Sequence, residues 1–194
     1  MTEGADGDQG RRLTLLTHPP TATASRLVFG DLGPLLRPAG PPPTAAGPGP
    51  IRCGPEPACR ATAAALGPAA EPVAALAGPD LGSWTGRELA EVAGSDPAGL
   101  GAWLSDPDAR PHGGETLAEL VRRLAEELAG CAWPGARSVW VLTPLAARAL
   151  TVAALAAPPA LVLAIDLAYG GEVQLSRHAG RWRLQGLRRH TSPS

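Results

Sequence analysis

Two short, mostly apolar runs that end at polar loops stand out along the chain. Residues 13–17 (LTLLT) and 138–142 (SVWVL) each have the composition of a strand buried on both faces, and each ends at a proline-containing loop. Residues 51–53 form a shorter candidate strand. Further strands are predicted at residues 161–167, 172–176 and 181–184, the last two joined by an Ala179-Gly180 turn.

Helices are predicted between these strands. The clearest covers residues 116–129, where Thr116 and Glu119 form a capping-box pattern. Its apolar residues recur at helical spacing: Leu117, Leu120, Val121, Leu124 and Leu128. Weaker patterns predict helices at residues 58–66, 85–92, 97–104 and 145–156, with one or two helical turns in 21–26. Because strands alternate with helices, we expect an α/β fold of three layers, with a mostly parallel central sheet flanked by helices.

The length of 194 residues indicates one domain. We expect that domain to span residues 11–188, with a disordered tail at 1–10 and a second tail at 189–194. Residues 38–50 (PAGPPPTAAGPGP) have too few apolar side chains to pack, so a mobile loop is predicted there.

The composition excludes several functions. All 17 basic residues are arginine, and the net charge of −1 gives no electrostatic reason to expect nucleic acid as a partner. The N-terminal residues lack the apolar stretch of a signal peptide, and prolines interrupt the most apolar segment, so neither secretion nor a membrane partner is expected. The cysteines Cys53, Cys59 and Cys131 fit neither a disulfide framework nor a zinc site. We therefore expect a cytoplasmic protein without a metal or cofactor.

Candidate chemistry lies where two predicted strands end. Ligands of parallel sheets bind beyond the carboxyl ends of the strands. Here those ends carry Thr17-His18-Pro19 and Leu142-Thr143-Pro144.

Six segments, in order along nearly the whole chain, carry a family resemblance. They are LTLLTHPPTATASR, GPEPACRATAAALG, LAGPDLGSWTGRELAEV, PHGGETLAELVRRL, VWVLTPLAARAL and IDLAYGGEVQLSRHAGRWRL. Together they resemble the histidine phosphatase superfamily, which includes the cofactor-dependent phosphoglycerate mutases. The first is similar to that family's Arg-His-Gly loop, the second to its arginine-bearing helix, and the fifth to its second strand with a Thr-His-Gly loop.

The resemblance implies a phosphatase or mutase chemistry. In that family a histidine attacks phosphorus as a neutral imidazole. Two arginines and a second histidine hold the phosphoryl oxygens, and a carboxylic acid protonates the leaving group. His18 occupies the position of the nucleophile.

The other family positions have changed. Thr17 replaces the arginine before the nucleophile, and Pro19 replaces the glycine after it. Ala58 stands at the position of the helix arginine, four residues before Thr62. The expected acids correspond to Gly78 and Thr85, and the second histidine corresponds to Pro144 or to Thr143, depending on whether Thr143 or Arg148 anchors the match.

These losses predict a catalytically impaired protein. A charge-assisted hydrogen bond contributes roughly 1.5–3 kcal/mol, and one transition-state arginine is worth about 10³–10⁵ in rate. We therefore expect a binding or regulatory domain whose partners are a small phosphate-containing anion and an unidentified protein. The alternative is an active phosphomonoesterase with a rearranged pocket, in which His18 is the nucleophile and arginines from other positions approach it. An α/β hydrolase with a Ser or Cys nucleophile ranks last, because the chain has no Gly-x-Ser-x-Gly motif.

Several residues remain candidates for the site. His18 is either a nucleophile or anion contact, or a loop histidine that bonds a neighbouring carbonyl. Arg60 either holds an anion or is a solvated helix residue, and Glu115 is either an acid or a carboxylate that favours a helix start. The candidate substrate-binding residues are Thr17, Arg26, Arg60, Glu115 and Thr143, with Arg148 as a further arginine near the pocket mouth. Arg122-Arg123 and Glu126-Glu127 are predicted to pair along a solvated helix face.

Overall fold

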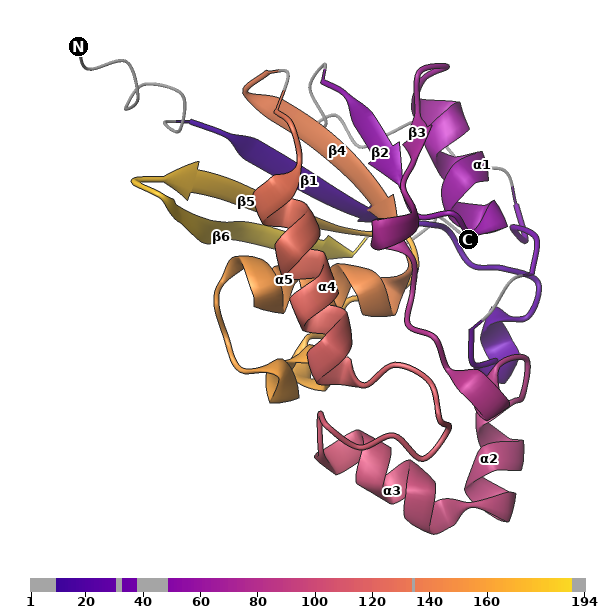
Figure 1. Cartoon of the computed structure of the whole chain (residues 1–194). Coiled ribbons are helices and arrows are strands. Elements are labelled where there is room, and N and C mark those ends of the chain that lie inside the picture. Colours follow the sequence, from indigo (N-terminus) through magenta and orange to yellow (C-terminus); the bar gives the residue numbers. More distant parts are fainter. Residues whose placement is uncertain (1–9, 31–32, 38–48, 134, 190–194) are drawn as a thin grey trace.

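The computed structural model describes residues 10–30, 33–37, 49–133 and 135–189 (Figure 1). Most of the predicted tail at 1–10, residues 38–48 of the predicted loop, and residues 190–194 lie outside the described residues. Among the described residues, no helix has both the length and the apolar character needed to cross a bilayer.

Within the described residues, six strands form one mixed sheet in the order β3-β2-β4-β1-β5-β6. Neighbours among β3, β2, β4 and β1 are parallel, and β5 and β6 are added to β1 as an antiparallel hairpin. The strands are β1 (Arg12–Thr17), β2 (Ile51–Cys53), β3 (Glu71–Pro72), β4 (Arg137–Leu142), β5 (Gly171–His178) and β6 (Arg181–Arg189). The predicted α/β class with a largely parallel centre is confirmed.

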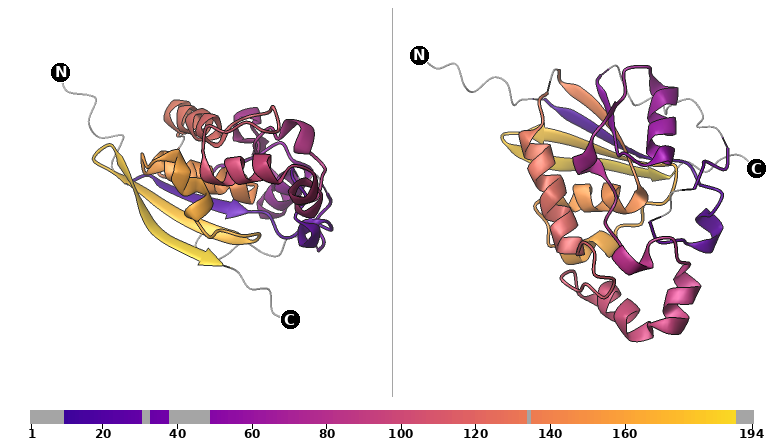
Figure 2. Two further views of the ribbon diagram at one scale, coloured as in Figure 1. Left: turned by 90° about the horizontal axis from the view of Figure 1, so that it is seen from below. Right: turned by 45° about the vertical axis from the view of Figure 1, so that its right-hand side comes forward.

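The helices connect and cover these strands. The α-helices are α1 (Pro57–Leu66), α2 (Leu89–Ser95), α3 (Pro97–Ser105), α4 (Leu117–Gly130) and α5 (Pro144–Ala154). Short 3₁₀ helices are η1 (Ala24–Arg26), η2 (Ala74–Leu76), η3 (Gly82–Trp84) and η4 (Pro159–Ala164). In the views of Figures 1 and 2, α2 and α3 form a small lobe beyond one end of α4.

The sheet has an apolar core on each face. Leu13 and Leu15 of β1 face one side with Trp140 of β4, in a buried cluster that includes apolar residues of α4 and α5 and extends to Trp103 of α3. Leu16 and Val141 face the other side, where α1 covers them with Cys59 and Ala63. This alternation along β1 and β4 gives helix, sheet and helix layers.

Helix α4 forms as its sequence predicts. The Thr116 hydroxyl accepts a hydrogen bond from Glu119 N (3.1 Å), and the Glu119 carboxylate accepts one from Thr116 N (2.9 Å). This reciprocal cap satisfies two backbone donors at the helix start. The predicted apolar stripe is buried: Leu117, Leu120, Val121, Leu124 and Leu128.

Two predicted elements are wrong in type or extent. The sequence predicts a strand at residues 161–167, but the 3₁₀ helix η4 (Pro159–Ala164) occupies most of this stretch. The pair Pro158-Pro159 lacks the backbone N–H donors of a sheet ladder and favours a helical start. The helix expected at 85–92 begins only at Leu89, because Gly86 adopts a left-handed conformation (φ +81°) that interrupts it.

Candidate active site at the carboxyl ends of the strands

The parallel strands β1, β2 and β4 end at the same edge of the sheet. The β1–β4 register pairs Thr17 with Leu142, and His18 N donates a hydrogen bond to Leu142 O (3.3 Å). On the other side of β4, Gly54 N donates to Val141 O (2.9 Å). The loops after the three strands therefore lie side by side, and we call Thr17, His18, Glu56, Gly78 and Thr143 the carboxyl-end site.

His18 is held in one orientation beneath the surface. Its side chain is 2% exposed, its ring lies 5.3 Å from the ring of Tyr169, and its Nδ1 lies 2.8 Å from the carbonyl oxygen of Pro19. A carbonyl oxygen only accepts, so Nδ1 carries the proton of this hydrogen bond. The basic nitrogen of the neutral ring is then Nε2, so Nε2 is the atom available to act as a nucleophile or proton acceptor.

Thr17 connects β1 to the start of β5. Its hydroxyl donates to the carbonyl of Ala168 (2.7 Å) and accepts from Gly171 N (2.7 Å). The residue is 3% exposed. The hydroxyl is thus used in the closure of the sheet directly beside His18.

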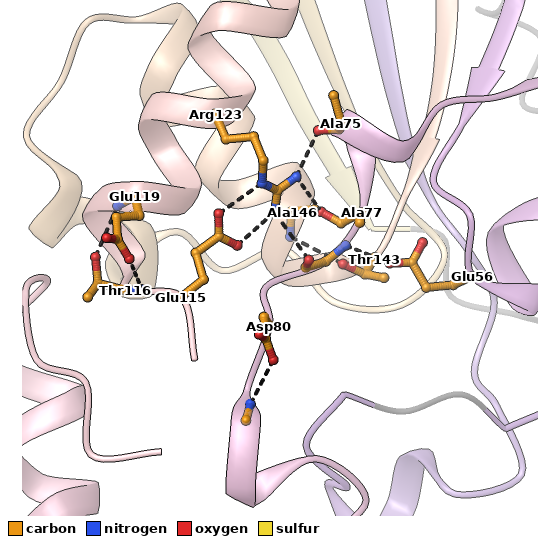
Figure 3. Close-up of polar contacts among 12 residues, drawn as sticks. Glu56, Ala75, Ala77, Asp80, Glu115, Thr116, Glu119, Arg123, Thr143 and Ala146 are labelled. Carbon is orange, nitrogen blue, oxygen red and sulfur yellow. Dashed lines mark hydrogen bonds and ion pairs between the residues drawn. The ribbon is translucent and has the colours of Figure 1, made fainter. Parts of the chain in front are cut away.

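A carboxylate stands between the loops that follow β2 and β3 (Figure 3). Oε1 of Glu56 accepts a hydrogen bond from Gly78 N at 2.5 Å. A Cβ atom at Gly78 would lie 3.2 Å from Thr143 Oγ1 and 3.3 Å from Glu56 Oε1. The acid absent from position 78 is therefore matched by a carboxylate that reaches the same place from position 56.

Thr143 caps the helix that follows β4. Its hydroxyl accepts a hydrogen bond from Ala146 N (3.3 Å), so it satisfies one backbone donor at the start of α5. The side chain is beside Gly78 and one strand away from Glu56 in the sheet order (Figure 3). The structure therefore brings the predicted residues Thr17, His18 and Thr143 to one edge.

Glu115 belongs to a hydrogen-bond network that connects to the carboxyl-end site through Arg123. Its carboxylate binds Arg123 through two hydrogen bonds of 2.8 and 2.7 Å. The same guanidinium donates to the carbonyls of Ala75 (2.8 Å), Ala77 (3.2 Å) and Gly78 (3.2 Å). Through these bonds α4 fixes the 75–78 segment against the carboxyl-end site (Figure 3).

The predicted pairing along α4 is wrong for Arg123 and Glu127. Arg123 binds Glu115, and Glu127 binds Arg52 of β2 at 2.6 Å. Helical spacing indicates which residues share a face, but the packed loop and strand offered both side chains partners in less exposed positions.

The arginines predicted for the pocket lie in different surroundings. Arg26 pairs with Glu88 at 2.9 Å on an exposed surface. Arg60 lines a groove of about 460 Å³ with Cys53 and Pro72, and His18 is not among the residues of that groove. Arg148 Nε donates to Leu167 O (2.9 Å), two residues before Tyr169, whose ring packs against His18.

The cysteines offer no nucleophile. Burial raises the pKa of the Cys59 thiol strongly, and the neighbouring Glu56 carboxylate raises it further. Burial also raises the pKa of Cys53. Both thiols are therefore protonated at neutral pH, and a thiolate mechanism has no support. The part of the chain that the structure describes contains no group of three or more His, Cys, Asp or Glu side chains arranged to hold a metal.

Sequence reasoning missed Glu56, Arg123 and Tyr169 at this edge. Glu56 carried a usable signal, since it lies three residues after a predicted strand, where ligands of parallel sheets bind. Arg123 and Tyr169 carried none, because tertiary packing alone brings α4 to the 75–78 segment and places residue 169 on His18.

Fold and site together define a three-layer α/β protein with a buried histidine at the edge where the parallel strands end. A histidine phosphatase superfamily (branch 1) profile matches residues 47–190. The chain belongs to the histidine phosphatase superfamily, as the six sequence segments predicted.

Solved structures agree with this assignment. The native structure of a mycobacterial glucosyl-3-phosphoglycerate phosphatase is 27% identical, with a TM-score of 0.74, and the match covers 90% of this chain and 97% of that one. A structure of that phosphatase with VO3 has a TM-score of 0.76 at 26% identity, covering 93% and 100%. The alpha-ribazole phosphatase of Shigella flexneri matches at 16% identity with a TM-score of 0.70, covering 91% and 95%. No curated protein sequence matches the chain.

Proposed function

We propose that this chain is a catalytically impaired member of the superfamily that acts as a binding or regulatory domain. The observation that carries the proposal is the charge at the carboxyl-end site. The residues directly after β1, β2 and β4 include no arginine, and the charged side chain among them is the carboxylate of Glu56.

A phosphate dianion at this site would face repulsion. Like charges in a partly buried site repel more strongly than in bulk water, because the surrounding dielectric constant is lower. Phosphoryl transfer depends on positioning and on cations that stabilise the equatorial oxygens. Glu56 supplies the opposite charge at that edge.

The contacts of the arginines support the same interpretation. Arg26 is neutralised by Glu88, and Arg60 lines a separate groove beside Cys53. Thr17, at the position of a family arginine, uses its hydroxyl within the fold. With two arginines, a histidine and the acid of the family pattern replaced, we expect almost no turnover even though such effects are not additive.

An active phosphomonoesterase is the second candidate, and two observations favour it. The hydrogen bond from Nδ1 of His18 to Pro19 O sets the tautomer of a nucleophile. Arg148 donates to Leu167 O, close to the segment that packs on His18. In this mechanism Nε2 of His18 attacks phosphorus as the P–O bond to the leaving group breaks, and a protonated Glu56 gives its proton to the leaving oxygen. Water then hydrolyses the phosphohistidine, and its proton goes to the Glu56 carboxylate, which restores the starting state.

The solved relatives suggest the ligand class. The mycobacterial phosphatase has been solved with VO3, a phosphate analogue. A small phosphate-containing anion is accordingly the ligand that we propose for this chain, bound away from the Glu56 carboxylate, alongside an unidentified protein partner.

Phosphatase assays separate the two candidates. Purified protein is incubated with p-nitrophenyl phosphate and a panel of phosphate esters between about pH 5 and 8. We expect turnover far below the roughly 1 s⁻¹ at the lower end of ordinary enzymes. His18→Ala should leave this residual rate unchanged, and His178→Ala, on the exposed hairpin, serves as the matched control.

Efficient turnover that depends on His18 would overturn the proposal that the protein is catalytically impaired. Turnover of about 1 s⁻¹ or more that His18→Ala abolishes and His178→Ala preserves would establish His18 as a nucleophile. In that case Arg148→Gln and Glu56→Gln should each reduce kcat. An acid-labile phosphate on His18, detected by mass spectrometry of the quenched reaction, would also establish this role.

We also propose a cytoplasmic location, which the free thiols of Cys53, Cys59 and Cys131 support. Protein taken from cells and denatured without a reductant should react with iodoacetamide at all three. Protection of any pair by a disulfide would contradict this location.

A further inference from the structure

A second polar site lies at the opposite end of the sheet. Where β1 and β4 begin, the structure has a cavity of about 220 Å³. Two arginines line it together with hydroxyl and amide side chains, and none of its lining residues is acidic. We call it the amino-end groove; its polar lining residues include Arg12, Thr14, Arg137, Ser176 and Gln185.

The strand register sets these side chains in one row. Arg12 of β1 is the direct neighbour of Arg137 on β4 and of Ser176 on β5, and Ser176 in turn faces Arg183 on β6. Direct neighbours on adjacent strands share a face. Three guanidinium groups therefore extend from one row of one sheet face, and two of them lie side by side.

Such a row is unfavourable unless something neutralises it. Like charges placed opposite one another on adjacent strands destabilise a sheet. Within the described residues, none of the ion pairs includes Arg12, Arg137 or Arg183. All three side chains are exposed. They take part in none of these ion pairs even though the whole chain has 18 acidic residues and 17 basic ones.

Other arginines of the chain are neutralised. Arg26, Arg52, Arg110 and Arg123 each pair with a glutamate. Carboxylates are therefore available, yet among the described residues none lines the amino-end groove. The Glu172 carboxylate is engaged by the amide of the lining residue Gln174 (2.6 Å). The uncompensated charge of two neighbouring arginines makes this groove a place on the described surface that fits an anion.

We propose that the amino-end groove binds a small phosphate-bearing anion, of the size of pyrophosphate or a short phosphoester. Guanidinium groups match phosphate oxygens in paired hydrogen bonds. Hydroxyl and amide groups of Thr14, Ser176 and Gln185 supply further donors. The cavity has the room of about seven waters at roughly 30 Å³ each, which suits a ligand with a few phosphate groups.

This groove is separate from the carboxyl-end site. Arg12 and His18 are six residues apart along extended β1, which corresponds to about 20 Å. Binding here is therefore independent of the chemistry at His18. The site has the character of a ligand or effector site, and it stands whether or not the chain hydrolyses phosphoesters.

Isothermal titration of the full chain with pyrophosphate at low ionic strength tests the proposal. We expect Arg12→Gln and Arg137→Gln each to weaken binding roughly tenfold or more, because each removes charge-assisted hydrogen bonds to phosphate. Arg122→Gln removes an equal charge from the exposed face of α4 and is the matched control. Its affinity for pyrophosphate should equal that of the unaltered chain. Circular dichroism verifies that each variant is folded.

A second experiment tests where on the protein pyrophosphate binds. In ¹⁵N-labelled protein, pyrophosphate should shift the side-chain amide signal of Gln185, and His18→Ala should bind pyrophosphate with unchanged affinity. Equal affinity in Arg12→Gln and Arg122→Gln would overturn the proposal, as would loss of binding in His18→Ala. Binding of an RNA oligomer without any binding of pyrophosphate would replace the small ligand by a macromolecule and would equally overturn it.

Discussion

The two ends of strands β1 and β4 use their polar residues in opposite ways. At the carboxyl end, the hydroxyl groups of Thr17 and Thr143 bond the backbone, and Glu56 places negative charge beside His18's edge of the sheet. At the amino end, Arg12 and Arg137 face solvent without a carboxylate among the described residues. We propose that the edge corresponding to the family's catalytic site supports the fold in this chain, and that the capacity to bind an anion lies at the other edge.

Because the two ends differ in this way, substitutions at each end should affect stability and pyrophosphate binding differently. Substitutions at the carboxyl end should lower stability and leave pyrophosphate binding intact. Substitutions of Arg12 or Arg137 should do the reverse, because both side chains are exposed and repel one another.

The largest effect is expected from Arg123→Leu. It removes six hydrogen bonds, leaving the Glu115 carboxylate and the carbonyls of Ala75, Ala77 and Gly78 without their donor. We expect the free energy of unfolding to fall by about 2–3 kcal/mol, less than for a fully buried pair. Urea denaturation measures this loss.

Its neighbour Arg122 provides the control on the same helix. Arg122 is exposed, so Arg122→Leu should change stability by no more than about 0.5 kcal/mol. Similar losses in both variants would show that the network around Glu115 contributes little, and the carboxyl end would then no longer count as structural.

The second effect concerns the hydroxyl beside His18. Thr17→Val keeps the shape of the side chain but removes both 2.7 Å hydrogen bonds of the hydroxyl, so that the Gly171 N–H and the Ala168 carbonyl keep only the longer bond between them (3.3 Å). We expect a loss of about 1–3 kcal/mol in unfolding free energy. Thr17→Ser retains the hydroxyl and should lose less; if the two variants are equally stable, the hydrogen bonds of Thr17 are not what holds this edge.

The stability of the protein should depend on pH through His112, which lies three residues before Glu115. Burial lowers the pKa of His112 below its ordinary value of 6.5, and its Nδ1 accepts a hydrogen bond from Gly114 N (3.0 Å). The unfolded chain binds a proton more readily than the folded one, so stability should fall as the pH drops below about 6.5. Denaturant unfolding between about pH 5 and 8 measures this loss.

The variant His112→Asn isolates that contribution. Its amide oxygen replaces Nδ1 as the acceptor for Gly114 N–H but does not titrate in this range. We expect a flatter dependence of stability on pH. An unchanged slope would assign the acid sensitivity to other groups.

The smallest effect is expected from Arg26→Gln. The Arg26–Glu88 pair is exposed, with 56% of the arginine side chain accessible, so its loss should change stability by less than about 1 kcal/mol. Pyrophosphate affinity, measured by titration calorimetry, should be unchanged. A large loss of affinity would place Arg26 in an anion site and would remove the contrast between the two ends.

The sequence alone predicted the α/β class, both central strands, the capped helix α4 and the segment order of the superfamily. These features depend on local periodicity and on turn and cap residues, which act over a few positions. The sequence prediction for residues 161–167 is wrong because their apolar character suits a strand or a partly buried 3₁₀ helix equally well. Neither the length nor the composition of residues 161–167 showed that β5, and not this segment, would pair with β1.

Tertiary structure alone decided the partners of charged groups. The Glu56 carboxylate, the Arg123 guanidinium and the row of Arg12 and Arg137 come from segments far apart in the chain. Spacing along the sequence determines which residues share a face of one element, and only sheet register and packing determine which faces meet. For this protein the chain therefore specifies a histidine phosphatase scaffold by itself, and the fold determines at which end of that scaffold an anion finds positive charge.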